Sequence, residues 1–446
     1  MLNKATTYYS LTFKSIFIFS ICLLFVIPVF SQHKDPITFS VKPFRNNGFY
    51  TTDDTKIGCV IRLFNDSSQV LEGTVLCRVT NENNIPVFTD TSYITIKDGG
   101  SFYKTIRLNK TLLKPGIYEV QAFLNTPVRK DSLYYAIGYN AEQYRSSNQP
   151  PNDLSLYWQD AKKELASIPP NYSINKRTDL ADKYSDVYQI TFQSAGNINI
   201  KSWLTIPKEK GIFPLLMQVP NFLQPAIPDK RREVAVFSID PRGSGNSADP
   251  IRADSAGFLL WNINQKQSYI FRSLYLDCVR GLEFIYSQGA TLKIDTTKVT
   301  VAGEGIGATL AAAAVALNGK PKGLYLQNPL MIDMPSLLAL SEQRKAFSWP
   351  VNLFQNYIHH PNSTDNASSF FYTWRYFDPL YLASQIHCNV LIQLGGKSSS
   401  YYLPCIYHFY TRLNTSQKEI YVCPDCNNAL KSTFYTFRDM WLNEVF

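Results

Sequence analysis

The amino-acid sequence predicts an α/β protein in which a small antiparallel β-sandwich precedes a larger domain with a mostly parallel, doubly covered sheet. Three observations lead to this prediction. Short β-branched and aromatic runs, separated by turn residues, fill residues 38–139 without a helical period. From residue 154 onward, helical patterns alternate with strand patterns. Several of these later strands are continuous apolar runs, which is typical of parallel strands buried on both faces.

The β-rich region is expected to span residues 36–140. Residues 113–120 (Leu-Lys-Pro-Gly-Ile-Tyr-Glu-Val) are similar to the late-strand entry of immunoglobulin-like domains. Cys59 and Cys77 fall in two adjacent expected strands, where they form either an internal disulfide or two buried thiols. Residues 141–153 are polar and contain Ser and Pro pairs, which predicts a linker. The expected strands cover residues 56–64, 73–80, 93–97, 102–108 and 116–124.

The C-terminal domain is expected to cover residues 154–446, with residues 348–377 inserted over one end of its sheet. Helices are predicted at residues 154–168, 267–287, 306–317, 334–345 and 403–413. Strands are predicted at residues 186–192, 198–206, 213–219, 234–239, 298–301, 323–327, 389–394 and 419–423.

Length and composition exclude several classes of protein. A chain of 446 residues exceeds what one core usually organises, so two domains are expected. With 45% hydrophobic and 18% charged residues, the chain lacks the composition of a disordered protein. Its net charge of +9 includes no run of five basic residues, so nucleic-acid binding is not expected. The 14% of aromatic residues indicates sugar-stacking surfaces or simply many strands.

Residues 1–31 predict an export signal. Lys4 and Lys14 precede an apolar run over residues 15–30, and small or β-branched residues follow where a signal peptidase cleaves. The run has 16 residues, fewer than the roughly 20 that a membrane-spanning helix needs. No later segment is long and apolar enough to span a membrane. We therefore expect a periplasmic, cell-surface or secreted protein, with no transmembrane segment once the signal is cleaved.

Five sequence blocks stand out in the C-terminal part: residues 157–160 (Tyr-Trp-Gln-Asp), 198–207 (a strand block ending in Pro), 240–245 (Asp-Pro-Arg-Gly-Ser-Gly), 267–286 (a long helix) and 376–378 (Tyr-Phe-Asp). Together they resemble the acetyl xylan esterase and cephalosporin C deacetylase family of α/β-hydrolases. Their order and spacing agree over roughly residues 154–446. The resemblance implies an α/β-hydrolase fold for this domain.

The catalytic chemistry of such a fold starts from a serine on a strained strand-to-helix turn, Gly-x-Ser-x-Gly. Residues 299–308 contain the strand, the flanking Gly303 and Gly307, and the start of an alanine-rich helix. Glu304 and Gly305 complete the turn, and the resemblance places Gly305 at the position of the nucleophile. Glycine offers no nucleophile.

The resemblance also places the other two members of the triad. The acid would follow the strand that ends at Gly395, which gives Ser398, and the histidine would follow the next strand, which gives Asn428. No His occurs after His408. All three triad positions therefore lack the required side chain, and we expect the protein to be inactive as a serine esterase.

Backbone N–H groups at the same site do not depend on the missing triad side chains. The N–H groups of Phe222 and Ile306 are expected to form an oxyanion-hole-like pair, which could recognise a carbonyl group without cleaving its ester. Asp240 and Arg242 belong to the glycine-containing turn and are expected to brace the loop around this site rather than contact substrate.

Other candidate chemistry is weaker. Glu304 is expected to be a charged turn residue rather than a carboxylate catalyst. Cys423 and Cys426 are expected to form a structural disulfide or two free thiols rather than a redox site. The spacing Cys-x2-Cys occurs only once, so no metal site and no cofactor is expected. His359, His360 and His387 are expected at the surface or in loops, and His408, within an aromatic helix, is expected to be packed or hydrogen-bonded.

The function that the sequence predicts is therefore an exported, non-catalytic relative of carbohydrate acetyl esterases that binds a glycan or a protein partner. One alternative is an active esterase with displaced residues, such as Ser398, Ser399 or Ser400 with His408. A second alternative is a structural component of a cell-envelope assembly. An intact pocket lined by Trp or Tyr around Gly305 would favour the binding protein, and a Ser–His contact within about 3.2 Å would favour the displaced-site esterase. A pocket filled by side chains would favour the structural component. The sequence names neither the ligand nor the oligomeric state.

Overall fold

The computed structural model describes residues 36–446 apart from residues 46–47, 249–256, 346–347, 361–364, 396–401 and 424–431. The expected signal peptide, Ser398, Asn428 and Cys426 therefore lie outside the described residues. Residues 37–446 form one compact unit. The boundary at residues 141–153 between two domains remains a prediction.

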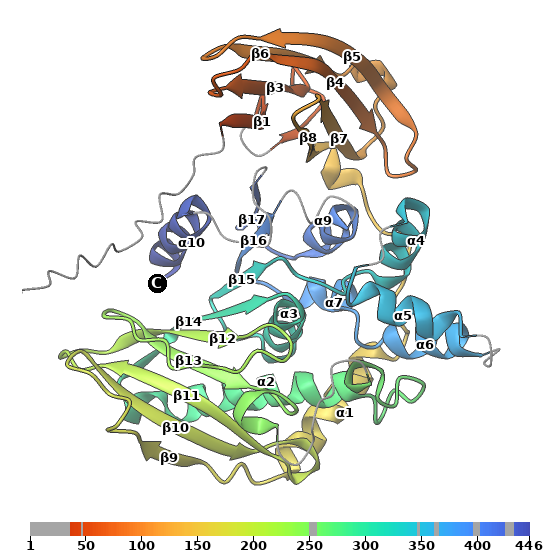
Figure 1. Ribbon diagram of the computed structural model, residues 1–446. Coiled ribbons are helices and arrows are strands. Elements are labelled where there is room, and N and C mark those ends of the chain that lie inside the picture. The colour runs from red at the N-terminus through yellow and green to blue at the C-terminus, as the bar shows by residue number, and fades with distance from the viewer. Residues whose placement is uncertain are drawn as a thin grey trace, which may run out of the picture. The chain divides into compact units, whose positions relative to one another are not determined.

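Two sheets form the β-rich N-terminal region, as the sequence predicts (Figure 1). One sheet has the order β1-β3-β6 and the other the order β2-β8-β7-β4-β5. All pairings are antiparallel except the short β2–β8 pair. Cys59 and Cys77 are buried free thiols, so the alternative of an internal disulfide is wrong. The strands are β1 Ile37–Pro43, β2 Phe49–Tyr50, β3 Gly58–Asn65, β4 Leu71–Thr80, β5 Pro86–Ile96, β6 Ser101–Arg107, β7 Gly116–Asn125 and β8 Lys130–Tyr139.

The C-terminal region contains a nine-stranded sheet of order β17-β16-β15-β14-β12-β13-β11-β10-β9 (Figure 1). Six neighbouring strands, β12 to β17, are parallel to one another. The strands β11, β10 and β9 extend the sheet in antiparallel pairing. This confirms the predicted α/β class. The strands are β9 Ser173–Lys176, β10 Ser185–Gln193, β11 Asn199–Pro207, β12 Phe213–Val219, β13 Ala235–Asp240, β14 Ile294–Glu304, β15 Gly323–Gln327, β16 Asn389–Gly395 and β17 Lys418–Cys423.

Nine helices of the described residues accompany this sheet. The expected insertion contains two of them, α5 and α6, and a C-terminal helix, α10, is one that the sequence analysis did not assign. The helices are α1 Leu154–Ser167, α2 Ile270–Gln288, α3 Ile306–Asn318, α4 Met334–Arg344, α5 Val351–Ile358, α6 Asn366–Trp374, α7 Pro379–Leu382, α9 Leu403–Arg412 and α10 Ser432–Val445.

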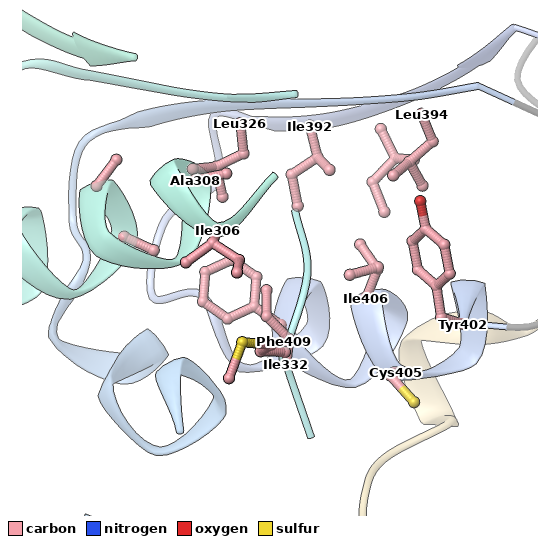
Figure 2. Close-up of a cluster of buried hydrophobic side chains, with 14 of the residues drawn as sticks. Ile306, Ala308, Leu326, Ile332, Ile392, Leu394, Tyr402, Cys405, Ile406 and Phe409 are labelled. Atoms are coloured by element: carbon pink, nitrogen blue, oxygen red, sulfur yellow. The ribbon is translucent and has the colours of Figure 1, made fainter. Parts of the chain in front are cut away.

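Alternation of side chains along the strands defines two faces of the large sheet. Leu324 and Leu326 of β15 belong to the main core together with α2, α3 and α9, and we call this side the α3 face. Tyr325, between them in sequence, packs instead with Leu216, Leu391, Trp441 and Leu442, and we call that side the α10 face. Figure 2 shows part of the α3 face, where Ile306 and Ala308 of α3 lie near Leu326 and Ile392, with Ile406 and Phe409 of α9 beyond.

A buried ion pair links an element of the β-rich region to the helices. Arg344 of α4 donates to Glu119 of β7 at 2.6 Å, and the Glu119 side chain is 6% exposed. Because both charged groups are buried, removing either one would leave the other without its partner and would strongly destabilise the fold.

Candidate active site

The turn between β14 and α3 has the backbone geometry of a nucleophile elbow. Gly305 lies at its apex with φ 57° and ψ −120°, a conformation that side-chain-bearing residues adopt only under strain. Its N–H donates to the carbonyl of Gln327 at 3.0 Å, and its carbonyl accepts from Leu330 N at 3.2 Å. The end of β15 and the following loop therefore hold the turn in place, although residue 305 carries no side chain.

Helix α3 packs closely against the loop that leaves β12. A Cβ atom on Gly307 would lie 2.2 Å from the carbonyl oxygen of Pro220 and 2.4 Å from that of Val219. Since these neighbours are backbone atoms, they cannot move aside cheaply, and only glycine fits. The close approach brings the next residues of the loop, Asn221 and Phe222, against the elbow.

The side chain of Asn221 occupies the centre of the site. Its Oδ1 atom accepts hydrogen bonds from Phe222 N at 2.8 Å and from Ile306 N at 3.2 Å. These are the two N–H groups that the sequence analysis predicts as oxyanion-hole donors, and here they converge on an oxygen of the protein itself. The structure therefore does not leave them free to recognise the carbonyl group of a ligand.

The same side chain fills the place where a nucleophile would stand. A Cβ atom on Gly305 would lie 2.3 Å from Asn221 Oδ1 and 2.6 Å from its Cγ, far inside van der Waals contact. Sequence reasoning missed Asn221. The available signal was a polar side chain directly after the carboxyl end of a buried parallel strand, next to a turn whose nucleophile position is glycine.

Asp240 and Arg242, the predicted bracing residues, connect the loops around the elbow. Asp240 Oδ1 accepts from Ala226 N at 2.6 Å, which fixes the far end of the loop that carries Asn221. Arg242 forms a bidentate pair with Asp277 of α2, with distances of 2.8 Å from Nε and 2.7 Å from Nη2. Both acidic side chains are fully buried, so these contacts hold the loops from within the core.

A row of aromatic rings lies beside Asn221. Phe222 stacks on Phe258 with ring centroids 5.9 Å apart and on Trp349 with centroids 5.8 Å apart. Trp261 contacts Phe258 edge-on at 6.4 Å. Trp261 is 46% exposed and Trp349 is 43% exposed, whereas Phe258 is buried. The row thus presents indole rings to solvent on a buried aromatic base.

Comparison with known proteins identifies the family. The family model described as acetyl xylan esterase (AXE1) matches residues 139–443, which is more than half of the chain. The chain belongs to the acetyl xylan esterase family.

Individual relatives agree with this assignment. The acetyl esterase Axe7A of Xylanibacter ruminicola is 21% identical over 376 residues, which cover 80% of each chain. The solved acetyl xylan esterase of Paenibacillus sp. R4 has a TM-score of 0.59 and 21% identity, covering 68% of this chain and 98% of its own. Acetyl xylan esterase 1 of Thermoanaerobacterium sp. JW/SL YS485 has a TM-score of 0.60 and 18% identity, covering 69% and 98%. The two structures show a shared fold.

Within this acetyl xylan esterase fold, Glu304 does not point toward the elbow. It lies on the α10 face, where it lines a cavity with Gln218 and Tyr325. Gly303, its neighbour, faces α3, because a Cβ atom there would lie 2.4 Å from the carbonyl of Gly307. Burial raises the pKa of Glu304, and a hydrogen bond from Gln327 partly opposes this shift.

His408, the histidine of the displaced-site alternative, is buried in α9. Its Nδ1 lies 2.5 Å from Asp333 Oδ2, and its ring packs against Tyr144 with centroids 4.7 Å apart. Burial alone would raise the pKa of Asp333, but the hydrogen bond and charge of His408, with Asn148 and Ser336, lower it. The candidate nucleophiles of this alternative, Ser398, Ser399 and Ser400, lie outside the described residues.

The remaining candidates are placed as follows. Cys423 is disulfide-bonded and therefore not a free thiol, whereas Cys426, its expected partner, lies outside the described residues. His359, His360 and His387 are exposed. Over the part of the chain that the structure describes, no three His, Cys, Asp or Glu residues are grouped to hold a metal ion. In that same part, no helix has the length and apolar character to cross a membrane.

Proposed function

We propose that this protein is an exported, non-catalytic member of the acetyl xylan esterase family that binds a glycan. The observation that carries the proposal is the pairing of Gly305 with Asn221 at the elbow. Gly305 supplies no nucleophile, and Asn221 Oδ1 takes both N–H donors that would stabilise an oxyanion. The site therefore lacks the reacting group and presents an already satisfied oxyanion hole.

The absence of open space at the elbow separates this proposal from an ordinary esterase. On the α3 face, beside Leu330, whose N–H donates to the Gly305 carbonyl, the described residues leave a cavity of about 10 Å³ that Met331 and Tyr402 also line. A cavity of that size holds at most one water molecule, and the acyl group of an ester does not fit. By the criterion stated above, a filled elbow on its own favours the structural alternative, so the elbow does not support ligand binding. The proposal of a binding function rests instead on the aromatic surface beside the elbow.

The aromatic row supports a glycan as the ligand. Sugar rings pack on exposed indole and phenyl faces, and Trp261 and Trp349 offer two such faces over a fixed aromatic base. Export, which the signal-like residues 1–31 predict, would place this surface where extracellular polysaccharide occurs. The names of the relatives, which refer to acetyl xylan esters, suggest acetylated xylan as the first glycan to test.

Two measurements test the proposal. The first is release of acetate from acetylated xylan and from a chromogenic acetate, for which we expect no rate above a mock-purified control. The second is retention on insoluble acetylated xylan, for which we expect binding that Trp261→Ala with Trp349→Ala reduces at least tenfold. Tyr93→Ala removes an aromatic side chain that is 87% exposed in the β-rich region, and as a control it should not alter binding.

Each alternative predicts a different result. Turnover that His408→Asn abolishes would replace the proposal with the displaced-site esterase. Absence of glycan binding, with co-purification of defined envelope proteins, would favour the structural component. Equal loss of binding in the Tyr93 variant would show that the aromatic row is not the binding surface.

A further inference from the structure

The α10 face of the large sheet contains a second, separate cavity. Strands β12 and β13 are adjacent and parallel, and their connection over residues 220–234 contains no helix, although parallel strands are usually joined through one. Helix α10 covers the neighbouring part of this face through Trp441 and Leu442. Between the connection and α10 remains a cavity of about 280 Å³, close to the lower end of ~300 Å³ for small-molecule sites.

The floor of this cavity is polar where a sheet covered by helices is ordinarily apolar. Gln218 of β12, Ser238 of β13, Glu304 of β14 and Gln327 of β15 all line it. The strand register places Gln218 beside Ser238 and Glu304 beside Gln327, so the four side chains form two neighbouring pairs on consecutive strands. Burying polar groups is costly unless they are hydrogen-bonded, so four such residues in one place require an explanation.

Hydrogen bonds within the protein reach all four of these side chains without filling every acceptor position. Gln218 accepts from Ser238 Oγ at 3.0 Å and donates to Asp229 at 2.7 Å. The Tyr325 hydroxyl lies 3.0 Å from Gln327 Oε1 and 2.6 Å from Gln393 Oε1, and its single proton can serve one of them at a time. Tyr325 thus links Gln327 and Gln393 into the same polar network as the floor of the cavity.

The carboxylate of Glu304 offers the most unoccupied acceptor positions for hydrogen bonds. An ionised carboxylate has about four acceptor positions, and the hydrogen bond from Gln327 occupies one of them. The nearest cations at the rim are already paired with other carboxylates, Arg231 with Asp229 at 3.1 Å and Arg438 with Asp439 at 2.7 Å. A ligand with several hydroxyl donors would complete this acceptor-rich floor.

We propose that this cavity binds a neutral, polyhydroxylated small molecule of about the size of one sugar ring. A hydroxyl group both donates and accepts, so it can serve the Glu304 carboxylate and the glutamine amides at once. Glu304 at the floor repels an anion, and an ammonium group donates but cannot accept a hydrogen bond from the amide and guanidinium N–H groups that line the cavity, so a neutral molecule fits the mixed lining best. The site lies on the opposite face of the sheet from α3 and does not depend on the function proposed for the elbow.

The test uses the full mature chain and defined probes. D-xylose, D-glucose and sorbitol are the neutral probes, and D-glucosamine and D-glucuronate supply a positive and a negative charge on a similar frame. Binding is measured by isothermal titration and by the rise in Tm at about 10 mM probe, which follows from selective binding to the folded state. We expect at least one neutral probe to bind more tightly than both charged ones.

Variants locate the binding. Glu304→Gln keeps the shape of the side chain and should weaken a neutral probe about tenfold, because the hydrogen bonds to a charged acceptor are lost. Ala302→Leu, which adds volume to the cavity wall, should abolish binding if the variant remains folded by circular dichroism. Glu209→Gln removes an exposed carboxylate and is the matched control, which should leave affinity unchanged.

Three results would overturn the proposal. They are preferential binding of a charged probe, absence of binding by every neutral probe, and binding that Glu304→Gln leaves unchanged. If Trp261→Ala with Trp349→Ala, rather than Glu304→Gln, abolishes probe binding, the ligand sits on the aromatic row and the cavity assignment is wrong. Acetate release and xylan binding are measured in separate assays. A negative result in those assays would count against the proposed function and would leave the conclusion about the cavity unchanged.

Discussion

Gly305→Ala is the perturbation that probes the elbow most directly, because it adds a single methyl group. At φ 57° and ψ −120° any side chain is strained by about 1–3 kcal/mol. The new Cβ atom would also lie 2.3 Å from Asn221 Oδ1, so the Asn221 side chain must leave its place. Leaving breaks hydrogen bonds to two backbone N–H groups, at roughly 0.5–1.5 kcal/mol each. The expected total loss of stability is about 2–6 kcal/mol.

A double-mutant cycle separates these contributions. Asn221→Ala removes the same hydrogen bonds without adding a methyl group, and the double variant pays for their loss only once. The destabilisation of the double variant should therefore fall short of the sum of the single variants by about 1–3 kcal/mol. The measurement is urea unfolding of all four proteins, followed by tryptophan fluorescence and by far-ultraviolet circular dichroism to check for a single transition.

The opposite end of helix α3 provides the control. Gly319 also has positive φ, at 76°, but a Cβ atom there would meet nothing within 4 Å. Gly319→Ala should cost backbone strain alone and should show no coupling to Asn221→Ala. If Gly305→Ala and Asn221→Ala were additive within about 0.5 kcal/mol, Asn221 would not occupy the nucleophile position, and the argument for a filled elbow would be refuted.

Three further predictions concern other parts of the fold. Arg344→Ala should destabilise the protein by about 3–5 kcal/mol in thermal or urea unfolding, because it leaves Glu119 buried and unpaired; replacing both residues with apolar ones should recover much of this loss. Burial raises the pKa of Glu304 above its ordinary value of 4.5, so the folded state binds more protons and wild-type stability falls as pH rises above that value. The Tm of Glu304→Gln should therefore exceed that of the wild type at pH 7 to 8 and match it near pH 4, and the opposite trend would disprove the raised pKa. Gly307→Ala should cost roughly 1–3 kcal/mol in urea unfolding, because the rigid Pro220 carbonyl lies in its path; a neutral effect would contradict the close approach.

The sequence was sufficient for the fold class and for the place of the elbow, because both depend on local patterns. Alternating strand and helix patterns predict the parallel sheet, and the Gly303 and Gly307 spacing predicts the turn. Helix α10 also has a local signal, because Phe437, Trp441 and Val445 recur at four-residue spacing. This helix could therefore have been predicted from the sequence. Ser398 and Asn428 remain predictions because they lie outside the described residues.

The contents of the site were not predictable in the same way. Asn221 reaches the elbow because Gly307 lets the loop after β12 approach α3, and its hydrogen bond from Ile306 joins residues 85 positions apart in sequence. The polar cavity depends on which strands are neighbours and on which face each residue occupies. The strand order β12-β13 beside β14-β15 and the lack of a helix over residues 220–234 create it, and neither follows from the residues of one strand.

The presence of Asn221 also gives the strained turn at Gly305 a structural role that does not depend on a nucleophile. Here the strained turn aims Ile306 N at Asn221 Oδ1, and the hydrogen bond ties α3 to the loop after β12. Gly305 gives the asparagine room, and the asparagine satisfies two N–H groups that would otherwise face the empty place of an oxyanion. The elbow thus acts as a structural joint. Placing a serine side chain at position 305 would therefore require moving Asn221 as well.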